Sequence, residues 1–154
     1  MTYTRILLHE QEGIVKLTLN RPQVRNALDL ELVEEFSHAL DALSHDRRVR
    51  VLLLTGAGRA FCSGGDVGGK FTPGEVDAGA FLESHFNPLI EKLHALPFPV
   101  VVAVNGVAAG AGCSLAIAGD FVIAARSARF ALAFVNMGLV PDCGTTWLLP
   151  RLIG

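Results

Sequence analysis

Two glycine-rich stretches contain residues whose main-chain N–H groups could take part in a reaction. Residues 61–66 read FCSGGD and residues 109–114 read AGAGCS, so small side chains dominate both. Small residues allow a ligand to approach the backbone closely, and N–H groups at the start of a helix carry partial positive charge. Such amides are suited to stabilising a developing oxyanion. The alternative is that the small residues only permit tight packing of a helix on a sheet.

Neither stretch fits the patterns that bind nucleotides, since G-x-G-x-x-G and G-x-x-x-x-G-K-[ST] are both absent from them. Metal and disulfide chemistry are not indicated either. The three cysteines (Cys62, Cys113 and Cys143) are odd in number and include no CxxC pair, and the five histidines are scattered singly. We therefore expect reduced thiols that act as small packing residues, no metal site and a cytoplasmic location.

The elements that position these stretches follow from the spacing of apolar residues. Short apolar runs indicate strands, and apolar residues at helical spacing indicate helices. In chain order, we predict a hairpin of residues 4–10 and 14–20, a helix with Asp29 as its N-cap, a strand at 49–56, a connection at 68–79, a helix at 80–96 bent at Pro88, a strand at 100–105, a helix near 112–119 and a strand at 121–125.

The repeated order of strand, loop and helix favours an α/β fold, with parallel strands covered by helices on both faces. Both glycine-rich stretches follow the C-terminal end of a predicted strand, which is where open α/β folds place ligands. We therefore expect the two stretches to face one cleft.

Composition limits the class of protein. The 154 residues fit one domain, and 51% hydrophobic residues with a mean hydropathy of +0.42 indicate a large core and a surface that further protein covers. The net charge is -2 without a basic stripe, which argues against nucleic acid as a partner. Residues 95–119 are uncharged, but Pro97, Pro99 and four glycines argue against a membrane span. The N-terminus does not read as a signal peptide.

Four motifs carry a specific resemblance to a known family. They follow that family's order and spacing and cover nearly the whole chain: NRPQVRNAL at 20–28, LTGAGRAFCSGGD at 54–66, VNGVAAGAGCSLAIAGD at 104–120 and GLVPDCGTTWLLPRLIG at 138–154. The sequence resembles the crotonase superfamily, also called the enoyl-CoA hydratase/isomerase family. The resemblance implies an α/β spiral of repeated ββα units and an acyl-CoA thioester substrate. It implies no metal or redox cofactor, with coenzyme A present as part of the substrate.

The resemblance also implies roles for particular residues. The N–H groups of Gly65 and Ala111 match the family's oxyanion hole. The loop around Arg25, Ala27 and Leu28 matches the loop that helps to hold the CoA adenine and phosphates. Removing a proton next to a thioester carbonyl places enolate charge on the carbonyl oxygen, and two fixed amides can stabilise that charge.

The sequence departs from the family's hydratases at the positions of their two catalytic glutamates. Ser114 and Phe134 stand there, and neither can act as a carboxylate base near neutral pH. Ser114 can orient a group by hydrogen bonding, and Phe134 adds apolar wall. Asp142, in PDCG at 141–144, matches the catalytic aspartate of the family's isomerases. The alternative role for Asp142 is a turn or a helix N-cap, because Pro-Asp before Gly-Thr-Thr is common turn chemistry.

Members of the resembled family continue beyond the point that matches Gly154, with a helical segment that closes the acyl pocket and builds trimers or hexamers. We therefore expect residues 1–154 to be an N-terminal core domain, and we expect assembly into a homotrimer or hexamer. The acyl pocket should also depend on the connection at 68–79. Asp66 is expected to bond loop amides beside the oxyanion donor.

These residues predict an acyl-CoA isomerase with an oxyanion hole and one aspartate acid/base. The resemblance over residues 133–152 is strongest to isomerases that act on ring 1,2-epoxyphenylacetyl-CoA in phenylacetate degradation. Those enzymes also shift double bonds in the enoyl-CoA chains of fatty acid metabolism, so 3-enoyl-CoA thioesters are candidate substrates. Two alternatives stay open. One is another reaction of the family, such as hydration, decarboxylation or thioester hydrolysis, and the other is a non-catalytic subunit that binds CoA thioesters.

Overall fold

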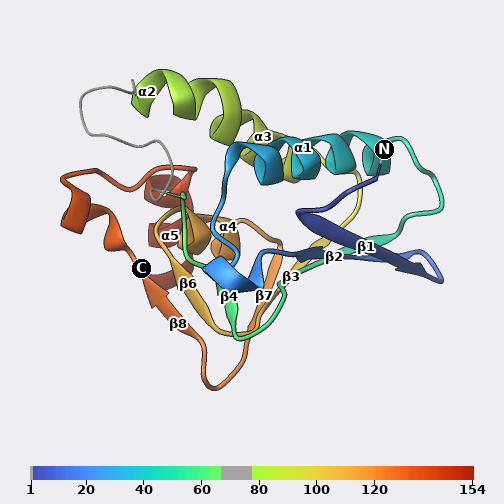
Figure 1. Ribbon diagram of the computed structural model, residues 1–154. Coiled ribbons are helices and arrows are strands. Elements are labelled where there is room, and N and C mark those ends of the chain that lie inside the picture. Colours follow the sequence, from blue (N-terminus) through green and yellow to red (C-terminus); the bar gives the residue numbers. More distant parts are fainter. Residues whose placement is uncertain (1, 67–77) are drawn as a thin grey trace.

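Four successive ββα units form the chain in the computed structural model, which describes residues 2–66 and 78–154 (Figure 1). The first contains β1 (Ile6–Gln11), β2 (Ile14–Leu19), the 3-10 helix η1 (Pro22–Val24) and α1 (Leu30–Ser44). The second contains β3 (Val51–Gly56), β4 (Ala60–Cys62), α2 (Ala78–Phe81), the π-helix η2 (Leu82–Phe86) and α3 (Asn87–His94). The third contains β5 (Val100–Val104), β6 (Val107–Ala109) and α4 (Ala111–Ile117). The fourth contains β7 (Phe121–Ala124), β8 (Arg129–Ala131), the 3-10 helix η3 (Ala133–Met137) and α5 (Thr145–Ile153).

The strands of these units form two sheets. The larger sheet has the order β1-β2-β3-β5-β7, in which β1 and β2 are antiparallel and the other neighbours are parallel. The smaller sheet has the order β4-β6-β8, with parallel neighbours. From the second unit onward, the first strand of each unit therefore joins the larger sheet and the second strand joins the smaller one. This alternation makes the α/β spiral of ββα repeats that the resemblance implied.

The first hairpin and helix have the local structure that the sequence predicts. Glu12 and Gly13, between β1 and β2, have φ angles of 53° and 80°, which suit the tight turn of a hairpin. Asp29 caps α1, since its side chain accepts a hydrogen bond of 2.9 Å from a main-chain N–H in the first turn. The Glu35 carboxylate of α1 accepts the N–H groups of residues 4–6, which ties the start of the chain to this helix.

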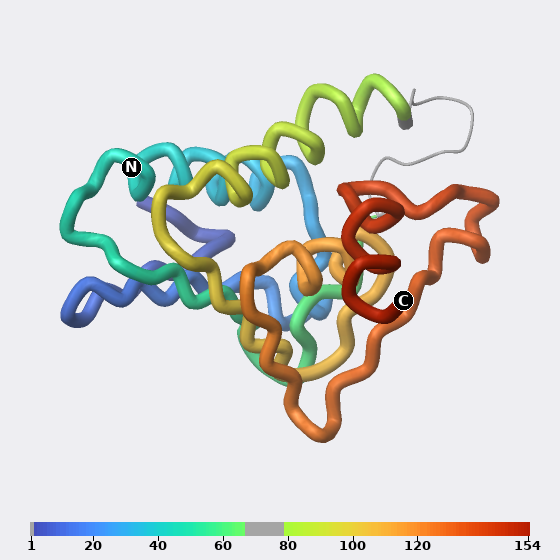
Figure 2. The backbone as a smooth tube through the Cα atoms, turned by 180° about the vertical axis from the view of Figure 1, so that it is seen from behind, coloured from blue at the N-terminus to red at the C-terminus, as the bar shows by residue number. Residues whose placement is uncertain are grey.

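The main core lies between the larger sheet and helices α1 and α3, which run side by side over one face of that sheet (Figure 1, Figure 2). Buried side chains from both layers include Leu17, Leu52 and Leu54 of the strands and Phe36 and Leu93 of the helices. Burial of one such side chain stabilises a fold by about 2 kcal/mol. Helix α4 is buried along its whole length and contacts β4, β5 and β6.

The expectation of helices on both faces of the sheet is wrong for β7. All four residues of this strand are exposed, with Phe121 at 62% and Ile123 at 64%. Large exposed apolar side chains continue on β8, η3 and α5, and include Phe130, Val135 and Trp147. The reason is that β7 is an edge strand and α5 packs on α4. The high hydropathy therefore reflects an open apolar face at the fourth unit as well as a large core.

Three short strands lie where the sequence predicted no strand. β4, β6 and β8 are each three residues long, which is too short for a periodic pattern to be visible.

The predicted helix at 80–96 is present but interrupted, because the π-helical η2 precedes α3 and Pro88 lies in the first turn of α3. Most of the predicted connection at 68–79 lies outside the described residues. Within residues 2–66 and 78–154, no helix is long and apolar enough to cross a membrane.

Candidate active site

The two glycine-rich stretches lie against each other where β4 and β6 end, and the cleft that the sequence predicted between them stays a prediction. Gly64 has a φ of +96°, and a Cβ atom placed on it would lie 2.7 Å from the carbonyl oxygen of Ala109. Glycine adopts this conformation at such close approach without strain, whereas other residues do not. The small residues of the first stretch therefore permit its contact with the second stretch. The packing of a helix on a sheet also occurs, since a Cβ atom on Gly112 of α4 would clash with the carbonyl oxygen of Cys62 in β4.

Gly65 and Ala111 carry the N–H groups that the sequence assigns to the oxyanion hole. Gly65 is exposed, and nothing lies within 4 Å of the position that its Cβ would take. Ala111 is the first residue of α4, so its N–H has no acceptor inside the helix. In the described part of the chain, neither N–H donates to a main-chain carbonyl. Both amides are therefore unused by the main chain, although Ala111 is only 8% exposed, and their joint use as an oxyanion hole stays a prediction.

The loop that the sequence assigns to CoA adjoins the Gly65 side of this site. Leu28 and Gly65 form a parallel bridge, with main-chain hydrogen bonds of 2.8 and 3.0 Å on either side of Gly65. Ala27 and Leu28 are buried, whereas the side chain of Arg25 is exposed. Of these three residues, Arg25 presents a side chain to solvent, and the other two connect the loop to the Gly65 stretch. The CoA contact itself stays a prediction.

Asp142 has a half-buried carboxyl group in the turn before α5. Its Oδ1 atom is buried and has no hydrogen-bond partner among the described residues. Burial raises the pKa of Asp142, while the Cys143 thiol and the N–H of Asp142 itself act in the opposite direction with less effect. Of the alternative role, the turn is present, because the Thr145 N–H donates to the Asp142 carbonyl at 2.9 Å. The helix cap is not, because the N-cap of α5 is Gly144 and no side chain caps that end.

Ser114 and Thr145 form a pair of buried hydroxyls that reaches the main chain of Asp142. The Thr145 hydroxyl donates to the Ser114 oxygen, and the Ser114 hydroxyl donates to the Asp142 carbonyl at 3.2 Å. The Thr145 N–H donates to the same carbonyl at 2.9 Å. Ser114 lies on α4 and Thr145 begins α5, and their exposed fractions are 0% and 1%. This hydroxyl pair therefore ties the helix that begins at Ala111 to the turn that carries Asp142.

Asp66 has a partner that sequence reasoning missed. Its carboxylate accepts a hydrogen bond of 2.8 Å from Nη1 of Arg21, a buried side chain 45 residues earlier. Asn26 is also buried, and its Nδ2 donates to the carbonyls of residues 57, 60 and 61. The sequence analysis assigned no role to Arg21, Asn26 or Thr145.

All three residues lie inside the motifs at 20–28 and 138–154 that carry the family resemblance. A polar residue inside such a motif could have been recognised as a candidate for a buried hydrogen bond.

Phe134 and the cysteines are buried in the structure. Phe134 lies in η3 and is 6% exposed. Cys62, Cys113 and Cys143 are buried free thiols, and burial raises the pKa of all three, to about 12 for Cys62. Protonated thiols are weak nucleophiles, in agreement with the packing role expected from the sequence. Among the described residues, no group of three or more His, Cys, Asp or Glu could hold a metal ion.

Residues 9–154 match the enoyl-CoA hydratase/isomerase family, so the chain belongs to this family. Its fold is that of the crotonase enzymes, as the sequence predicted. The chain is 50% identical to 1,2-epoxyphenylacetyl-CoA isomerase of Escherichia coli over 152 residues, which cover 97% of this chain and 58% of that protein. It is 39% identical to crotonyl-CoA hydratase of Syntrophomonas wolfei over 155 residues, which cover 100% of this chain and 59% of that protein.

The crystal structure of an enoyl-CoA hydratase from Bacillus anthracis superposes on the chain with a TM-score of 0.89 and 35% sequence identity. The superposition covers 98% of this chain and 59% of that structure. The chain therefore spans about three fifths of the length of the relatives that it matches. These relatives carry the names of both isomerases and hydratases, so family membership leaves the reaction open.

Proposed function

We propose that the protein containing this chain is an acyl-CoA isomerase, in which Asp142 moves a proton while the N–H groups of Gly65 and Ala111 stabilise an enolate oxygen. The observation that carries the proposal is the half-buried carboxyl group of Asp142, whose buried Oδ1 has no partner among the described residues. A buried oxygen atom without a hydrogen-bond partner destabilises the folded protein, and a functional role for Asp142 would explain why this arrangement is kept. Ser114 and Phe134 at the hydratase positions, and the similarity to an isomerase, support the same choice.

For a 3-enoyl-CoA thioester, the Asp142 carboxylate removes a proton from C2, and the electron pair moves into the thioester, whose carbonyl oxygen becomes an enolate. Asp142 then returns the proton to C4. The double bond moves from C3–C4 to C2–C3, and the thioester carbonyl and the carboxylate are restored. Each amide donor to the enolate oxygen contributes on the order of a hundredfold in rate. The sum of the steps uses no water and no electrons, so the proposal needs no metal or redox cofactor.

The environment of Asp142 suits this role. A carboxylate whose pKa is raised by burial is a stronger base than an ordinary aspartate. The hydroxyl pair of Ser114 and Thr145 holds the main chain of Asp142, which favours a constant position for its carboxyl group. In this proposal Phe134 forms part of the apolar wall around the acyl chain. One carboxyl group then serves as both base and acid.

The proposed substrates are 1,2-epoxyphenylacetyl-CoA, which the name of the 50% identical relative supports, and 3-enoyl-CoA thioesters, which suit a single acid/base beside an oxyanion hole. In this proposal the loop of Arg25, Ala27 and Leu28 helps to bind the CoA adenine and phosphates. The exposed side chain of Arg25 supports that role, because a guanidinium group suits phosphate recognition. Coenzyme A thus enters as part of the substrate.

The test uses the natural protein that contains this chain, assayed with a 3-enoyl-CoA and with an epoxyphenylacetyl-CoA. We expect turnover of at least one of them. Asp142→Asn keeps the shape of the side chain and removes the base, so turnover should fall by at least about a hundredfold. Acyl-CoA affinity, measured by calorimetry, should change little. Asp46→Asn is the matched control, because Asp46 is paired with the exposed Arg48 on the surface and should leave turnover unchanged.

Other outcomes would separate the alternatives. Acyl-CoA binding without turnover of any thioester would favour a non-catalytic binding subunit. A 3-hydroxyacyl-CoA product would show hydration, and a free acid would show thioester hydrolysis. Near-normal turnover by Asp142→Asn would place the base elsewhere.

We also propose that the open apolar face of β7, β8, η3 and α5 is covered in the natural protein, with a homotrimer or hexamer as the assembly. The exposed Phe121, Ile123 and Trp147 support this, because large apolar side chains are commonly covered by further protein. Light scattering at micromolar concentration measures the mass directly. A stable monomer of the natural protein would contradict the proposal.

A further inference from the structure

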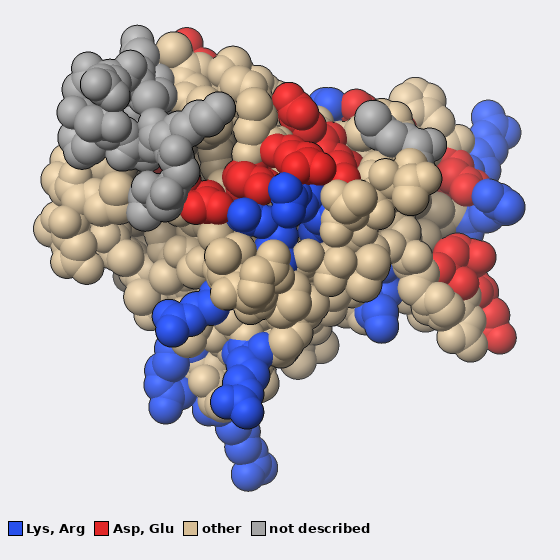
Figure 3. Space-filling view, viewed as in Figure 1, with Lys and Arg blue, Asp and Glu red and all other residues tan. Residues whose placement is uncertain are grey.

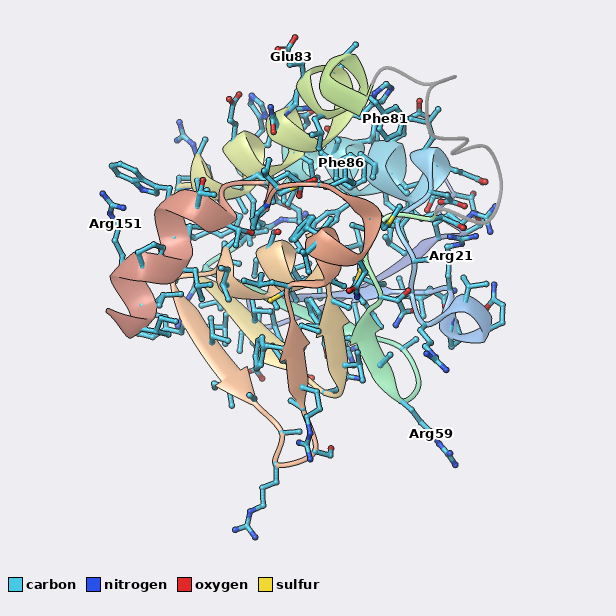
Figure 4. The ribbon with its side chains drawn as sticks, turned by 90° about the vertical axis from the view of Figure 1, so that its left-hand side faces the viewer. Arg21, Arg59, Phe81, Glu83, Phe86 and Arg151 are labelled. Atoms are coloured by element: carbon cyan, nitrogen blue, oxygen red, sulfur yellow. The ribbon has the colours of Figure 1, made fainter. Side chains whose placement is uncertain are left out.

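Arg21 is a buried arginine whose side chain lies between η1 and the start of α1 (Figure 4). Its Nη1 donates to the Ala27 carbonyl at 2.6 Å and to the Asp66 carboxylate at 2.8 Å, and its Nη2 lies 3.2 Å from the Asp29 carboxylate. Arg59, by contrast, extends away from the molecule (Figure 4). Figure 3 shows acidic and basic side chains gathered at the centre of one face.

The backbone of Arg21 is itself held in place. Its N–H donates to Oδ1 of Asn26 at 2.9 Å, and its carbonyl accepts the N–H of Asn26 at 2.8 Å. The Nδ2 of Asn26 reaches the carbonyls of residues 57, 60 and 61, which are the first residue of the β3–β4 connection and the first two residues of β4. The Arg21 guanidinium therefore projects from a rigid point of the fold.

The two Nη1 contacts lie on either side of the bridge that carries Gly65. Ala27 directly precedes Leu28, and Asp66 directly follows Gly65, while Leu28 and Gly65 are the bridged pair. One nitrogen atom thus connects the two chain segments at the bridge. If this contact were lost, the bridge would keep its two main-chain hydrogen bonds, and Ser63 would still bond the carbonyls of residues 24 and 25. These remaining bonds all lie at or before the bridge, so the chain after Gly65 would lose its tie through Arg21 to residue 27.

We propose that Arg21 is a positioning residue, which fixes the direction of the Gly65 N–H through Asp66 and Ala27. This inference rests on the proposed function, because it assumes that the Gly65 N–H is an oxyanion donor. An oxyanion hole stabilises charge only when its donors are held at the correct place before the reaction. Arginine suits this task better than lysine, since its planar group can bond a carbonyl and two carboxylates at the same time.

The experiment measures the stabilisation of an enolate directly, with acetoacetyl-CoA as the probe. This thioester forms an enolate with strong ultraviolet absorbance, and a working oxyanion hole lowers the pH at which the bound probe becomes an enolate. Arg21→Met removes the charged contacts and keeps the length of the side chain. In this variant we expect the enolate titration of the bound probe to move upward by about one pH unit, which corresponds to a tenfold loss of stabilisation. The kcat for isomerisation should fall by a similar factor while KM changes little.

Arg5→Met is the matched control. Arg5 pairs with Glu31 at 2.6 Å and lies 3.6 Å from Asp29, but it makes no contact with Ala27 or Asp66 among the hydrogen bonds of the described residues. Loss of Arg5 should lower thermal stability only and leave the enolate titration unchanged. Arg21→Lys provides a second variant if Arg21→Met does not fold. It keeps the charge but cannot make all three contacts, so we expect a smaller upward shift.

The outcomes separate this inference from the proposed function. If wild-type protein binds acetoacetyl-CoA without lowering its enolate titration, the oxyanion hole itself is wrong. If wild-type protein lowers it and the folded Arg21 variants lower it equally, Arg21 has no positioning role. A loss of thermal stability in Arg21→Met with an unchanged enolate titration also overturns the inference, because a merely structural contact would behave in that way.

Discussion

The two sides of the candidate site are held by different kinds of contact. On the Gly65 side, the Arg21 guanidinium joins two chain segments through a carbonyl and two carboxylates. On the Asp142 side, the hydroxyls of Ser114 and Thr145 join α4 to the turn before α5 without any charge. The first contact set holds a proposed amide donor, and the second holds a proposed acid/base.

The difference follows from exposure. The carboxylate partners of Arg21 keep some hydration, since the side chains of Asp29 and Asp66 are 23% and 25% exposed. Ser114 and Thr145 are fully buried, where a charged group without an ideal partner would be costly. A chain can therefore use ions where water still reaches and neutral hydroxyls where it does not. Substitutions in the two sets of contacts should therefore have separate effects. Loss of the Arg21 contacts should weaken oxyanion stabilisation, and loss of the Ser114 and Thr145 contacts should slow proton transfer.

Gly64→Ala should have the largest effect on stability, because Gly64 lies where the two sides meet. The added Cβ would lie 2.7 Å from the main-chain oxygen of Ala109, and the φ of +96° is strained for alanine. We expect the free energy of unfolding to fall by roughly 3 kcal/mol, as measured in urea.

Gly65→Ala is the control for that prediction. No atom lies within 4 Å of the added Cβ, and Gly65 is not among the glycines with positive φ. Its free energy of unfolding should stay within about 0.5 kcal/mol of wild type. Equal losses in the two variants would contradict the close contact between the stretches.

Ser114→Ala should have the next largest effect, confined to the Asp142 side. The variant leaves the buried Thr145 hydroxyl without its acceptor, which costs about 1–3 kcal/mol of stability. Isomerisation should slow because the Asp142 turn is held less firmly. The enolate titration of bound acetoacetyl-CoA should not change, because the start of α4 keeps the hydrogen bond of 2.9 Å from the Gly110 N–H to the Ala131 carbonyl.

A double-mutant cycle with Thr145→Val sharpens this prediction. The two hydroxyls act as one unit, so the double variant should lose less stability than the sum of the single variants, by about 1 kcal/mol. Additive losses would show that the hydroxyls act independently. A shift of the enolate titration in Ser114→Ala would show that the two sides of the site are coupled.

The smallest expected effect is a gain of stability in Asp142→Asn. Burial raises the pKa of this carboxyl above its usual range in the folded protein, so the folded state favours the neutral form. Below the unfolded pKa, the carboxyl is neutral in both the folded and the unfolded protein. As the pH rises through the folded pKa, the folded wild-type protein must hold a buried charge, so its free energy of unfolding falls. The Tm of the variant should therefore exceed that of wild type by an amount that grows as the pH rises from the unfolded to the folded pKa of this carboxyl and stays constant above it. A difference in Tm that shows no dependence on pH from acid to neutral conditions would contradict this prediction.

Several features could be predicted from local sequence. The hairpin turn at Glu12 and Gly13, the Asp29 cap and the alternation of strand and helix depend on residues close in the chain, and each was predicted correctly. The family also follows from the sequence, because its four motifs are long and lie in a fixed order. Asp142 was recognised as a candidate, but only by resemblance, since the same residues are common in turns.

The partners across the fold could not be read from the sequence. Arg21 and Asp66 are 45 residues apart, and Ser114 and Thr145 are 31 apart, so their contacts exist only after the ββα units have stacked. The short strands β4, β6 and β8 were missed for a related reason, because three residues show no period and their pairing depends on neighbouring units.

The sequence by itself determined the longer strands, the helices and the first hairpin turn, because those choices depend on apolar spacing, capping and glycine conformation within a few residues. Only the tertiary structure decided that the open apolar face lies on β7 and that a buried arginine lies beside Gly65. It also decided that Ser114 bonds the main chain of Asp142. The physical reason is that burial and long-range hydrogen bonds are properties of the packed units, and no local pattern of residue types specifies which distant group will satisfy a polar side chain.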